Sequence, residues 1–406
     1  MEKAGHRIAG DALMHVVLVI YFYERDLETP QQLLDRSSTI GPIAHALHNE
    51  GAEVTVLQRF HRNVSVEDKG VRFEFCVDAC DANLRKWQIP HAFHRAVRNS
   101  CARQASKSLV VHVHGLLYPL QTRFLRNALP FERAMVAQHH AEKPWNGIRR
   151  PLQKWGLRSV NGFFFAAPAL AEGWIHEGLI SKEQQIFEVM EGSTFFRCED
   201  RTVARARTGL SGAPVILWVG NLTANKDPLT VLSGFEQILR QVPLARLYMA
   251  YRSTDLLGAV QERIAASSSL REAVKLLGNV DHPKLEDIYN SADYFTLGSH
   301  YEGSGFALAE AMACGVIPVV TRIPSFMAMT DEGRAGACWT AGDPDAFSRA
   351  LLHLLQQPIE ALSKQVRRIF DQRLSYPAIA RASLRAYDEL TSKTMVRSVR
   401  APSSRR

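Results

Sequence analysis

The sequence lacks a long apolar run, and this absence excludes one class of protein. None of its 406 residues belongs to a stretch near the roughly 18 consecutive apolar residues that a membrane-spanning helix needs. The most apolar early segment, Ala12 to Tyr23, is short and rich in β-branched residues, and no small-residue cleavage site follows it. We interpret this segment as a buried strand rather than a signal peptide. We therefore expect a cytoplasmic protein.

Cysteine is also scarce, and its spacing excludes the common metal motifs. The six cysteines are scattered, and no CxxC pair occurs among them. In a long chain without a secretion signal, this favours free thiols in a reducing compartment. His91 and His94 have a spacing that could bind a metal, but no cysteine or carboxylate set lies near them. A solvated helix face is the stronger interpretation, and the sequence predicts no metal site.

The positive charge lacks the arrangement of a nucleic-acid-binding module. The formal net charge is +8, and its densest part is the stretch 391–406. No aromatic-basic motif of an RNA- or DNA-binding module accompanies it, so we expect no nucleic-acid partner. A second basic stretch, 143–158, contains interleaved tryptophan and leucine residues. It fits either a solvated helix face or peripheral contact with an anionic membrane at its inner surface.

Apolar runs alternate with amphipathic stretches along the chain, which indicates βαβ units and parallel sheets. The pattern begins at His15–Phe22 and restarts at Pro214–Val219, after the polar, basic segment Arg197–Ala213, which we expect to be a linker. The predicted class is α/β, with two Rossmann-like doubly wound domains facing across a cleft. The expected parts are an amino-terminal domain (1–197), a carboxyl-terminal domain (198–375), a further helix (376–392) and a disordered basic tail (393–406).

The stretch 302–315, EGSGFALAEAMACG, holds two carboxylates eight residues apart. Gly303 to Gly305 is poor helix sequence and Phe306–Ala313 is good helix sequence. Glu302 is therefore expected in a loop, and Glu310 about one turn into a helix.

The start of that helix leaves backbone N–H groups unpaired, which suits a phosphate, while the flanking carboxylates suit sugar hydroxyls. Ser304 could bond a phosphate, although capping the helix is the simpler role. The alternative interpretation of this stretch is a buried α/β crossover with two glutamates on the surface and no ligand.

A second loop strengthens the case for a diphosphate site. Gly220 follows the strand PVILWV directly, and Lys226 arrives just before the next helix, which Asp227 and Pro228 can start. A lysine and a helix N-terminus on neighbouring loops would together neutralise a diphosphate. A solvent-exposed lysine is the alternative for Lys226 alone.

These motifs resemble a known family. The pattern GxLxxxK from Gly220 to Lys226, the pair Ala292-Asp293, and E-x7-E running into EAMACGxxPVV are similar to the donor-binding domain of GT-B fold glycosyltransferases, retaining family 4. The resemblance covers roughly residues 215–350. In the amino-terminal half it is limited to architecture and short pieces around His112 to Gly115 and Val136 to His140.

The resemblance implies transfer of a sugar, with retention and without a metal, from a nucleotide-diphosphate sugar. It implies that the domain 1–197 binds the acceptor, that the domain 198–375 binds the nucleotide sugar, and that the helix 376–392 crosses back to the first domain. It implies no separate cofactor. Lys226 would neutralise the leaving diphosphate, Glu302 would lie by the sugar, and His140 would reach the donor sugar, so these three are the predicted catalytic residues. The predicted substrate-binding residues are Gly41, Gly220, Asn221, Val280, Gly303, Ser304, Gly305, Phe306 and Glu310.

Departures from the family pattern affect the charge of the site. The family's arginine after the first glycine is Asn221 here, only Gly41 remains of the usual glycine pair in the first loop, and Glu191-Gly192 replaces Asn-Gly. Arg322 is one candidate for the lost cation. The lone Asp-x-Asp, Asp343 to Asp345, follows a glycine and precedes a helix, so we expect a turn and cap rather than a metal clamp.

The leading hypothesis is a hexosyltransferase acting on a glycan, lipid-linked or small-molecule acceptor in cell-surface polysaccharide biosynthesis. A non-catalytic nucleotide-sugar-binding subunit of a glycan-assembly complex and a GT-B fold nucleotide-sugar epimerase remain open. His114 and His139 lie at strand ends, where a structural role is the more common one.

Overall fold

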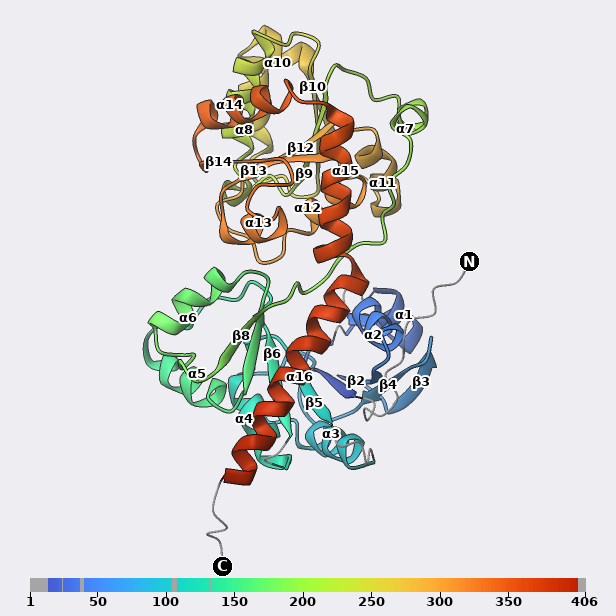
Figure 1. The fold of residues 1–406 in the computed structure, drawn as a ribbon, viewed down its shortest axis with the longest axis vertical. Helices are drawn as coiled ribbons and strands as arrows, with labels where there is room; N and C mark the ends of the chain where they lie inside the picture. Colours follow the sequence, from blue (N-terminus) through green and yellow to red (C-terminus); the bar gives the residue numbers. More distant parts are fainter. Residues whose placement is uncertain (1–13, 24, 37–39, 104–107, 131–132, 401–406) are drawn as a thin grey trace, which may run out of the picture. The chain divides into compact units, whose positions relative to one another are not determined.

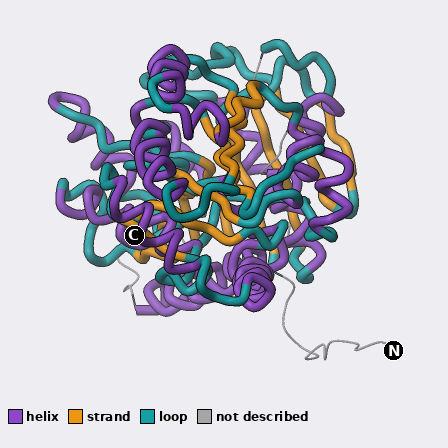
Figure 2. The backbone as a smooth tube through the Cα atoms, turned by 90° about the horizontal axis from the view of Figure 1, so that it is seen from above, coloured by secondary structure: helices purple, strands orange, loops and turns teal. Residues whose placement is uncertain are grey.

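The computed structural model describes residues 14–23, 25–36, 40–103, 108–130 and 133–400. The chain forms two compact units: unit 1 comprises 1–191 and 379–406, and unit 2 comprises 192–378. Each unit contains one sheet, and the strands run through the interior with helices and loops outside them (Figures 1 and 2). Within the described residues, no helix is long and apolar enough to cross a membrane.

Unit 1 is built on an eight-stranded sheet with the order β3-β4-β2-β1-β5-β6-β7-β8. Its pairings are parallel except for β3, which runs antiparallel to β4. β1 is buried along its whole length, as its run of β-branched residues predicts. The strands are β1 (His15–Ile20), β2 (Glu53–Arg59), β3 (Val64–Asp68), β4 (Val71–Cys76), β5 (Leu109–His114), β6 (Ala134–Gln138), β7 (Gly162–Phe165) and β8 (Gln185–Glu188).

Helices cover the faces of this sheet, and an apolar core lies beneath them. Val17, Val111 and Phe163 are fully buried members of that core. The helices are α1 (Pro30–Arg36), α2 (Ile40–Asn49), α3 (His91–Arg103), α4 (Pro119–Ala128), α5 (Arg150–Leu157), α6 (Glu172–His176) and, from residue 379 onward, α16 (Tyr376–Arg400), with short 3-10 turns at Gly147–Arg149 and Pro168–Ala171.

Unit 2 is built on a six-stranded parallel sheet with the order β11-β10-β9-β12-β13-β14. The strand order reverses its direction between β9 and β12, which is where ligands bind in open α/β sheets. The strands are β9 (Val215–Gly220), β10 (Arg246–Tyr251), β11 (Val274–Gly278), β12 (Tyr294–Leu297), β13 (Ile317–Thr321) and β14 (Ala337–Trp339). The helices are α7 (Arg201–Thr208), α8 (Pro228–Leu239), α9 (Leu257–Ala265), α10 (Ser268–Ala273), α11 (His282–Asn290), α12 (Phe306–Ala313), α13 (Pro324–Met329), α14 (Pro344–Leu354) and α15 (Ile359–Ile369), with a 3-10 turn at Ala224–Lys226 and a π turn at Phe370–Leu374.

Two segments expected to be irregular contain helix in the structure. The presumed linker Arg197–Ala213 contains α7, whose first turn is capped by Asp200 and whose Arg205 binds Asp293 at 2.7 Å. This helix was not predicted because its sequence is polar. Ion pairs hold it in place rather than a broad apolar face. The tail expected to be disordered from residue 393 continues α16 to Arg400, because no helix breaker interrupts it and Lys393 pairs with Glu389 one turn earlier. Residues 401–406 lie outside the described residues.

Candidate functional site

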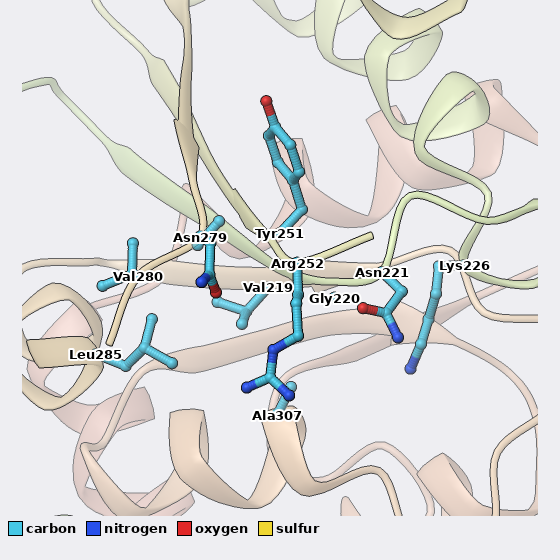
Figure 3. A pocket seen from close by; sticks show the side chains of 11 residues that line it. Val219, Gly220, Asn221, Lys226, Tyr251, Arg252, Asn279, Val280, Leu285 and Ala307 are labelled. Carbon is cyan, nitrogen blue, oxygen red and sulfur yellow. The ribbon is translucent and has the colours of Figure 1, made fainter. Parts of the chain in front are cut away.

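A pocket lies at the carboxyl ends of three neighbouring strands of unit 2. Gly220 ends β9, Tyr251 ends β10, and Asn279 and Val280 follow β11 directly. Ala307, in the first turn of α12, completes the pocket wall (Figure 3). Of the residues predicted to bind a donor, the structure brings Gly220, Asn221, Lys226 and Val280 together in this pocket.

The backbone at Gly220 passes close to a large buried side chain. Trp218, two residues earlier in β9, is fully buried. A Cβ atom placed on Gly220 would lie 3.2 Å from the Trp218 indole, closer than ordinary contact. A glycine at this position therefore keeps the floor of the pocket open at the end of β9.

The loop after Gly220 carries Lys226 into a short 3-10 turn. The Asp227 side chain accepts the Thr230 backbone N–H at 3.2 Å and caps α8, as predicted. The Lys226 ammonium binds a Glu302 carboxylate oxygen at 2.5 Å, and both side chains are largely buried. The structure thus joins two predicted catalytic residues that lie 76 positions apart in the chain. It also means that the Lys226 charge is already partly neutralised by Glu302.

The turn between Glu302 and α12 has the geometry that its glycines predict. Gly305 adopts the left-handed conformation with φ of +59° and forms the N-cap of α12. A Cβ there would lie 2.8 Å from the Phe326 ring. Within the described residues, the N–H groups of Gly303, Gly305 and Phe306 donate to no protein group. These donors and the dipole of α12 form a position suited to an anion.

Ser304 does not cap α12, which corrects one sequence expectation. The N-cap residue is Gly305, and α12 has no side-chain cap. Ser304 is buried, with 4% of its surface exposed. Phe306 is partly exposed at the first position of the helix, and Gly315 follows its end with φ of +73°, as expected.

Glu310 lies one turn into α12 and binds two side chains of α11. The Tyr289 hydroxyl donates to one carboxylate oxygen at 2.9 Å, and His282 Nε2 lies 2.7 Å from the other. The hydrogen bond that His282 donates to Glu310 raises the pKa of His282, and burial is the main cause that raises the pKa of Tyr289. Glu310 is therefore not a surface glutamate, which removes the alternative of two solvent-exposed carboxylates.

Among the pocket residues that escaped the sequence analysis are two polar ones at strand ends, Arg252 and Asn279. Arg252 follows the carboxyl end of β10, and Asn279 follows that of β11. Figure 3 shows the polar ends of Arg252, Asn221 and Lys226 turned to one side of the pocket. Their place in the sequence could have predicted them as pocket residues. A residue that directly follows a strand near β9 lies at this edge of the sheet. Arg322, the earlier candidate for an added cation, instead follows β13, outside the pocket wall, and its Nη2 lies 3.4 Å from the Cys338 carbonyl.

The histidines of unit 1 form a continuous buried chain. The Tyr387 hydroxyl lies 2.7 Å from His112 Nδ1, and the rings of His112 and His114 stack with centroids 4.4 Å apart. His114 Nδ1 lies 3.3 Å from His140 Nε2, and His140 Nδ1 binds the Glu191 carboxylate. Both ring nitrogens of His140 therefore have partners within unit 1. Its predicted approach to a donor sugar would require one of these two bonds to open.

Burial and charge shift the pKa values along this chain in different directions. Burial lowers the pKa of His112 to about 3 and that of His114 well below its usual value, so both rings are neutral. Burial also opposes a charge on His140, but the hydrogen bond and the charge of Glu191 outweigh it and raise the pKa of His140. A protonated His140 then donates to Glu191 through Nδ1 and to His114 through Nε2.

The structure also shows the surroundings of His139, His94 and Gly41. His139 stacks on Phe165 with centroids 4.6 Å apart, in keeping with a structural role. His94 is not on a solvated face as expected, because it is buried and bonds the Tyr21 hydroxyl at 3.0 Å. Gly41 lies in the first turn of α2, where a Cβ would meet nothing within 4 Å.

The described residues contain no group of three or more histidine, cysteine or acidic side chains placed to hold a metal ion. The Asp-x-Asp segment forms the turn and cap that its sequence predicts. Asp343 accepts the Ala346 backbone N–H at 2.9 Å and caps α14.

The fold matches solved structures along nearly the whole chain. It matches sucrose-phosphate synthase from Thermosynechococcus elongatus with a TM-score of 0.66 over 94% of this chain and 100% of that one, at 18% identity. It matches the catalytic domain of starch synthase IV from Arabidopsis thaliana with a TM-score of 0.64 over 95% of this chain and 100% of that one, at 13% identity. The architecture is that of the GT-B glycosyltransferases, and the predicted fold class is confirmed.

Sequence similarity then relates part of unit 2 to a known family. Residues 213–357 match the family Glycosyl transferases group 1, so the predicted resemblance is confirmed for the segment that forms the pocket. The chain is 36% identical over 140 residues to mannosylfructose-phosphate synthase of Agrobacterium fabrum, a match covering 32% of this chain and 30% of that protein. It is 29% identical over 171 residues to D-inositol 3-phosphate glycosyltransferase 2 of Catenulispora acidiphila, covering 40% of each. The chain thus spans less than half the length of these curated relatives.

Proposed function

We propose that the protein is a retaining glycosyltransferase that uses a nucleotide-diphosphate sugar as donor, bound in the pocket of unit 2. One observation carries the proposal. The Lys226–Glu302 ion pair and the free N–H groups at the start of α12 flank the carboxyl ends of the strands, within the segment that matches the glycosyltransferase family. Apolar Val280 and Leu285 line the other end of the pocket and suit a nucleobase.

The proposed chemistry follows from these groups. As the sugar–phosphate bond breaks, negative charge grows on the leaving diphosphate. The Lys226 ammonium and the N–H groups of Gly303 and Gly305 stabilise that charge without reorganising. Glu302 holds Lys226 in place and accepts a sugar hydroxyl, and Glu310 accepts a ribose hydroxyl. The leaving phosphate takes the acceptor proton, so no separate protein base is required.

The donor site can be tested by thermal unfolding with UDP, GDP, ADP and their glucose and mannose esters in the presence of EDTA. A ligand at about 100 times its Kd should stabilise the fold by roughly 2.7 kcal/mol. Lys226→Ala and Glu310→Ala should each reduce that shift. Lys284→Ala is the control, since its side chain is 75% exposed and it removes the same charge as Lys226→Ala.

Three results would contradict the proposal. Absence of any shift in folded wild-type protein would remove the donor site. A shift without measurable sugar transfer to any offered acceptor would favour the non-catalytic binding subunit, and interconversion of the nucleotide sugar itself would favour an epimerase.

The acceptor is proposed to be a glycan or a lipid-linked glycan at the cytoplasmic face of a membrane. One relative, 30% identical over 121 residues, is named GDP-mannose:cellobiosyl-diphosphopolyprenol alpha-mannosyltransferase of Xanthomonas oryzae. In unit 1, Ile148 is 96% exposed, and the adjacent stretch includes the basic residues Arg149 and Lys154. An exposed isoleucine among basic side chains suits an anionic lipid surface.

This surface contact has its own test. Ile148→Ser should reduce cosedimentation of the full chain with vesicles containing phosphatidylglycerol, and neutral vesicles should retain little protein. Val203→Ser is the matched control, because Val203 is an exposed apolar residue of unit 2. Equal binding of wild-type protein and Ile148→Ser would contradict the contact.

A further inference from the structure

In the pocket of unit 2, the positive charge of Lys226 alone is not enough to neutralise a bound diphosphate. A nucleotide sugar carries two negative charges on its diphosphate at neutral pH. Lys226 is the one lysine of the pocket wall, and Glu302 already binds it at 2.5 Å. A diphosphate that relied on Lys226 would have to share its charge with that buried carboxylate.

Arg252 differs from Lys226 in this respect. Within the described residues, no hydrogen bond or ion pair is made by its guanidinium, and the side chain is exposed to solvent. It lines the pocket beside Ala307, in the first turn of α12, where the free N–H groups of Gly305 and Phe306 lie (Figure 3). An uncommitted arginine and unpaired backbone donors thus occur at the same part of the pocket.

The position of Arg252 along the pocket also matters. Figure 3 shows its guanidinium between the apolar end, formed by Val280 and Leu285, and the Lys226 ammonium. In a nucleotide sugar, the diphosphate lies between the nucleoside and the sugar. A guanidinium can bind two phosphate oxygens at once, which an ammonium does not do.

We propose that Arg252 is the principal cation for the donor diphosphate, and that it supplies the charge absent at Asn221. This inference rests on the proposed function, since it assigns a binding residue within the same pocket. In this arrangement Lys226 and Glu302 act as a pair on the sugar side, while Arg252 holds the phosphate next to the nucleoside. Arg252 therefore decides how strongly the pocket prefers a nucleoside diphosphate to the bare nucleoside.

The test compares ligands that differ only in phosphate. Kd values are measured by calorimetry on the full chain for UDP, GDP and ADP and for uridine, guanosine and adenosine. Arg252→Ala should weaken the diphosphate that binds wild-type protein by roughly 10- to 100-fold, the range for loss of a charged hydrogen bond. The affinity for its nucleoside should change by less than about 2-fold. Arg252→Lys should give an intermediate loss.

Two controls separate this role from a structural one. Arg349→Ala removes a 71% exposed arginine from α14 and should leave every Kd unchanged. The salt dependence of diphosphate binding should also fall in Arg252→Ala, because one ionic contact is lost.

The possible results separate a failure of the Arg252 proposal from a failure of the proposed function. Equal diphosphate binding by wild-type protein and Arg252→Ala would overturn the inference and leave the proposed function intact. Parallel loss of nucleoside and diphosphate would also overturn it, since Arg252 would then serve the nucleoside or the local fold. If wild-type protein bound none of the three diphosphates, the proposed function would fail and the inference with it.

Discussion

At the scale of single residues, side-chain partners decide the properties of the pocket. Glu310 engages His282 and Tyr289, while Glu302 engages Lys226, so each carboxylate of the E-x7-E motif has a separate role. The sequence of the motif predicted that Glu302 lies in a loop and that Glu310 lies in the helix that follows it. It could not predict these partners, because Lys226 and Glu302 are brought together only by the order of the strands.

The His282–Glu310 pair makes stability depend on pH in a defined direction. Because the pKa of His282 is raised in the folded protein, the pair stabilises the fold fully below the unfolded pKa of about 6.5. That contribution is lost as pH rises through the folded pKa. The melting temperature of wild-type protein should therefore exceed that of His282→Gln by more near pH 5.5 than near pH 8.5. A difference that stays constant with pH would show that the pair carries no proton-linked stability.

At the scale of secondary-structure elements, the turn before α12 positions the candidate anion site. Alanine at position 305 would have to adopt φ of +59° and would place its Cβ 2.8 Å from Phe326. Gly305→Ala should therefore destabilise the protein by roughly 2–4 kcal/mol in urea unfolding.

Gly41 provides the matched comparison for that change. It lies in a helix with open space around its Cβ position, so Gly41→Ala should be neutral or stabilising by up to about 1 kcal/mol. Equal effects at the two glycines would contradict the steric argument. The result would also separate two residues that the sequence analysis placed in the same substrate-binding group.

The Tyr387 side chain is one of the groups that tie the helix α16 to the sheet of unit 1. Tyr387 is fully buried, stacks on Phe164, and bonds His112 at 2.7 Å. Tyr387→Phe keeps the ring but leaves a buried His112 nitrogen unpaired, which should cost about 1–3 kcal/mol in chemical unfolding.

Tyr23→Phe is the corresponding control, because Tyr23 is only half-buried and its hydroxyl makes no hydrogen bond within the described residues. Its effect should stay within about 0.5 kcal/mol. A loss as large as that of Tyr387→Phe would indicate a general cost of removing a hydroxyl rather than the loss of the His112 bond.

Elements with strong local patterns were predicted well. The strands β9 and β10 and the helices α8 and α12 follow their apolar runs closely, and α8 begins at its predicted Asp227 cap, because short-range preferences and burial agree there. The helix α7 was missed because its sequence, RTVARART, has one fully buried alanine and owes its place to ion pairs with distant residues. Arg252 was missed for the same reason. Local sequence does not show which strands are neighbours, and the place of Arg252 in the pocket depends on that order.

At the scale of the whole molecule, each of the two units has its own sheet and its own buried interior. Units with separate cores can unfold in separate steps. We expect urea unfolding to show two transitions, and a bound nucleoside diphosphate should raise the midpoint of only one of them. A single transition that moves as a whole with nucleotide would show that the units unfold together.

The indole of Trp218 gives the pocket an optical reporter. This side chain is fully shielded from water directly beneath Gly220, so its emission should lie toward the blue end of the tryptophan range. A phosphate or a nucleobase arriving above Gly220 would alter the electric field and the quenching at that ring. The change in intensity on adding nucleotide should disappear in Trp218→Phe, so that donor binding can be followed by light without a label.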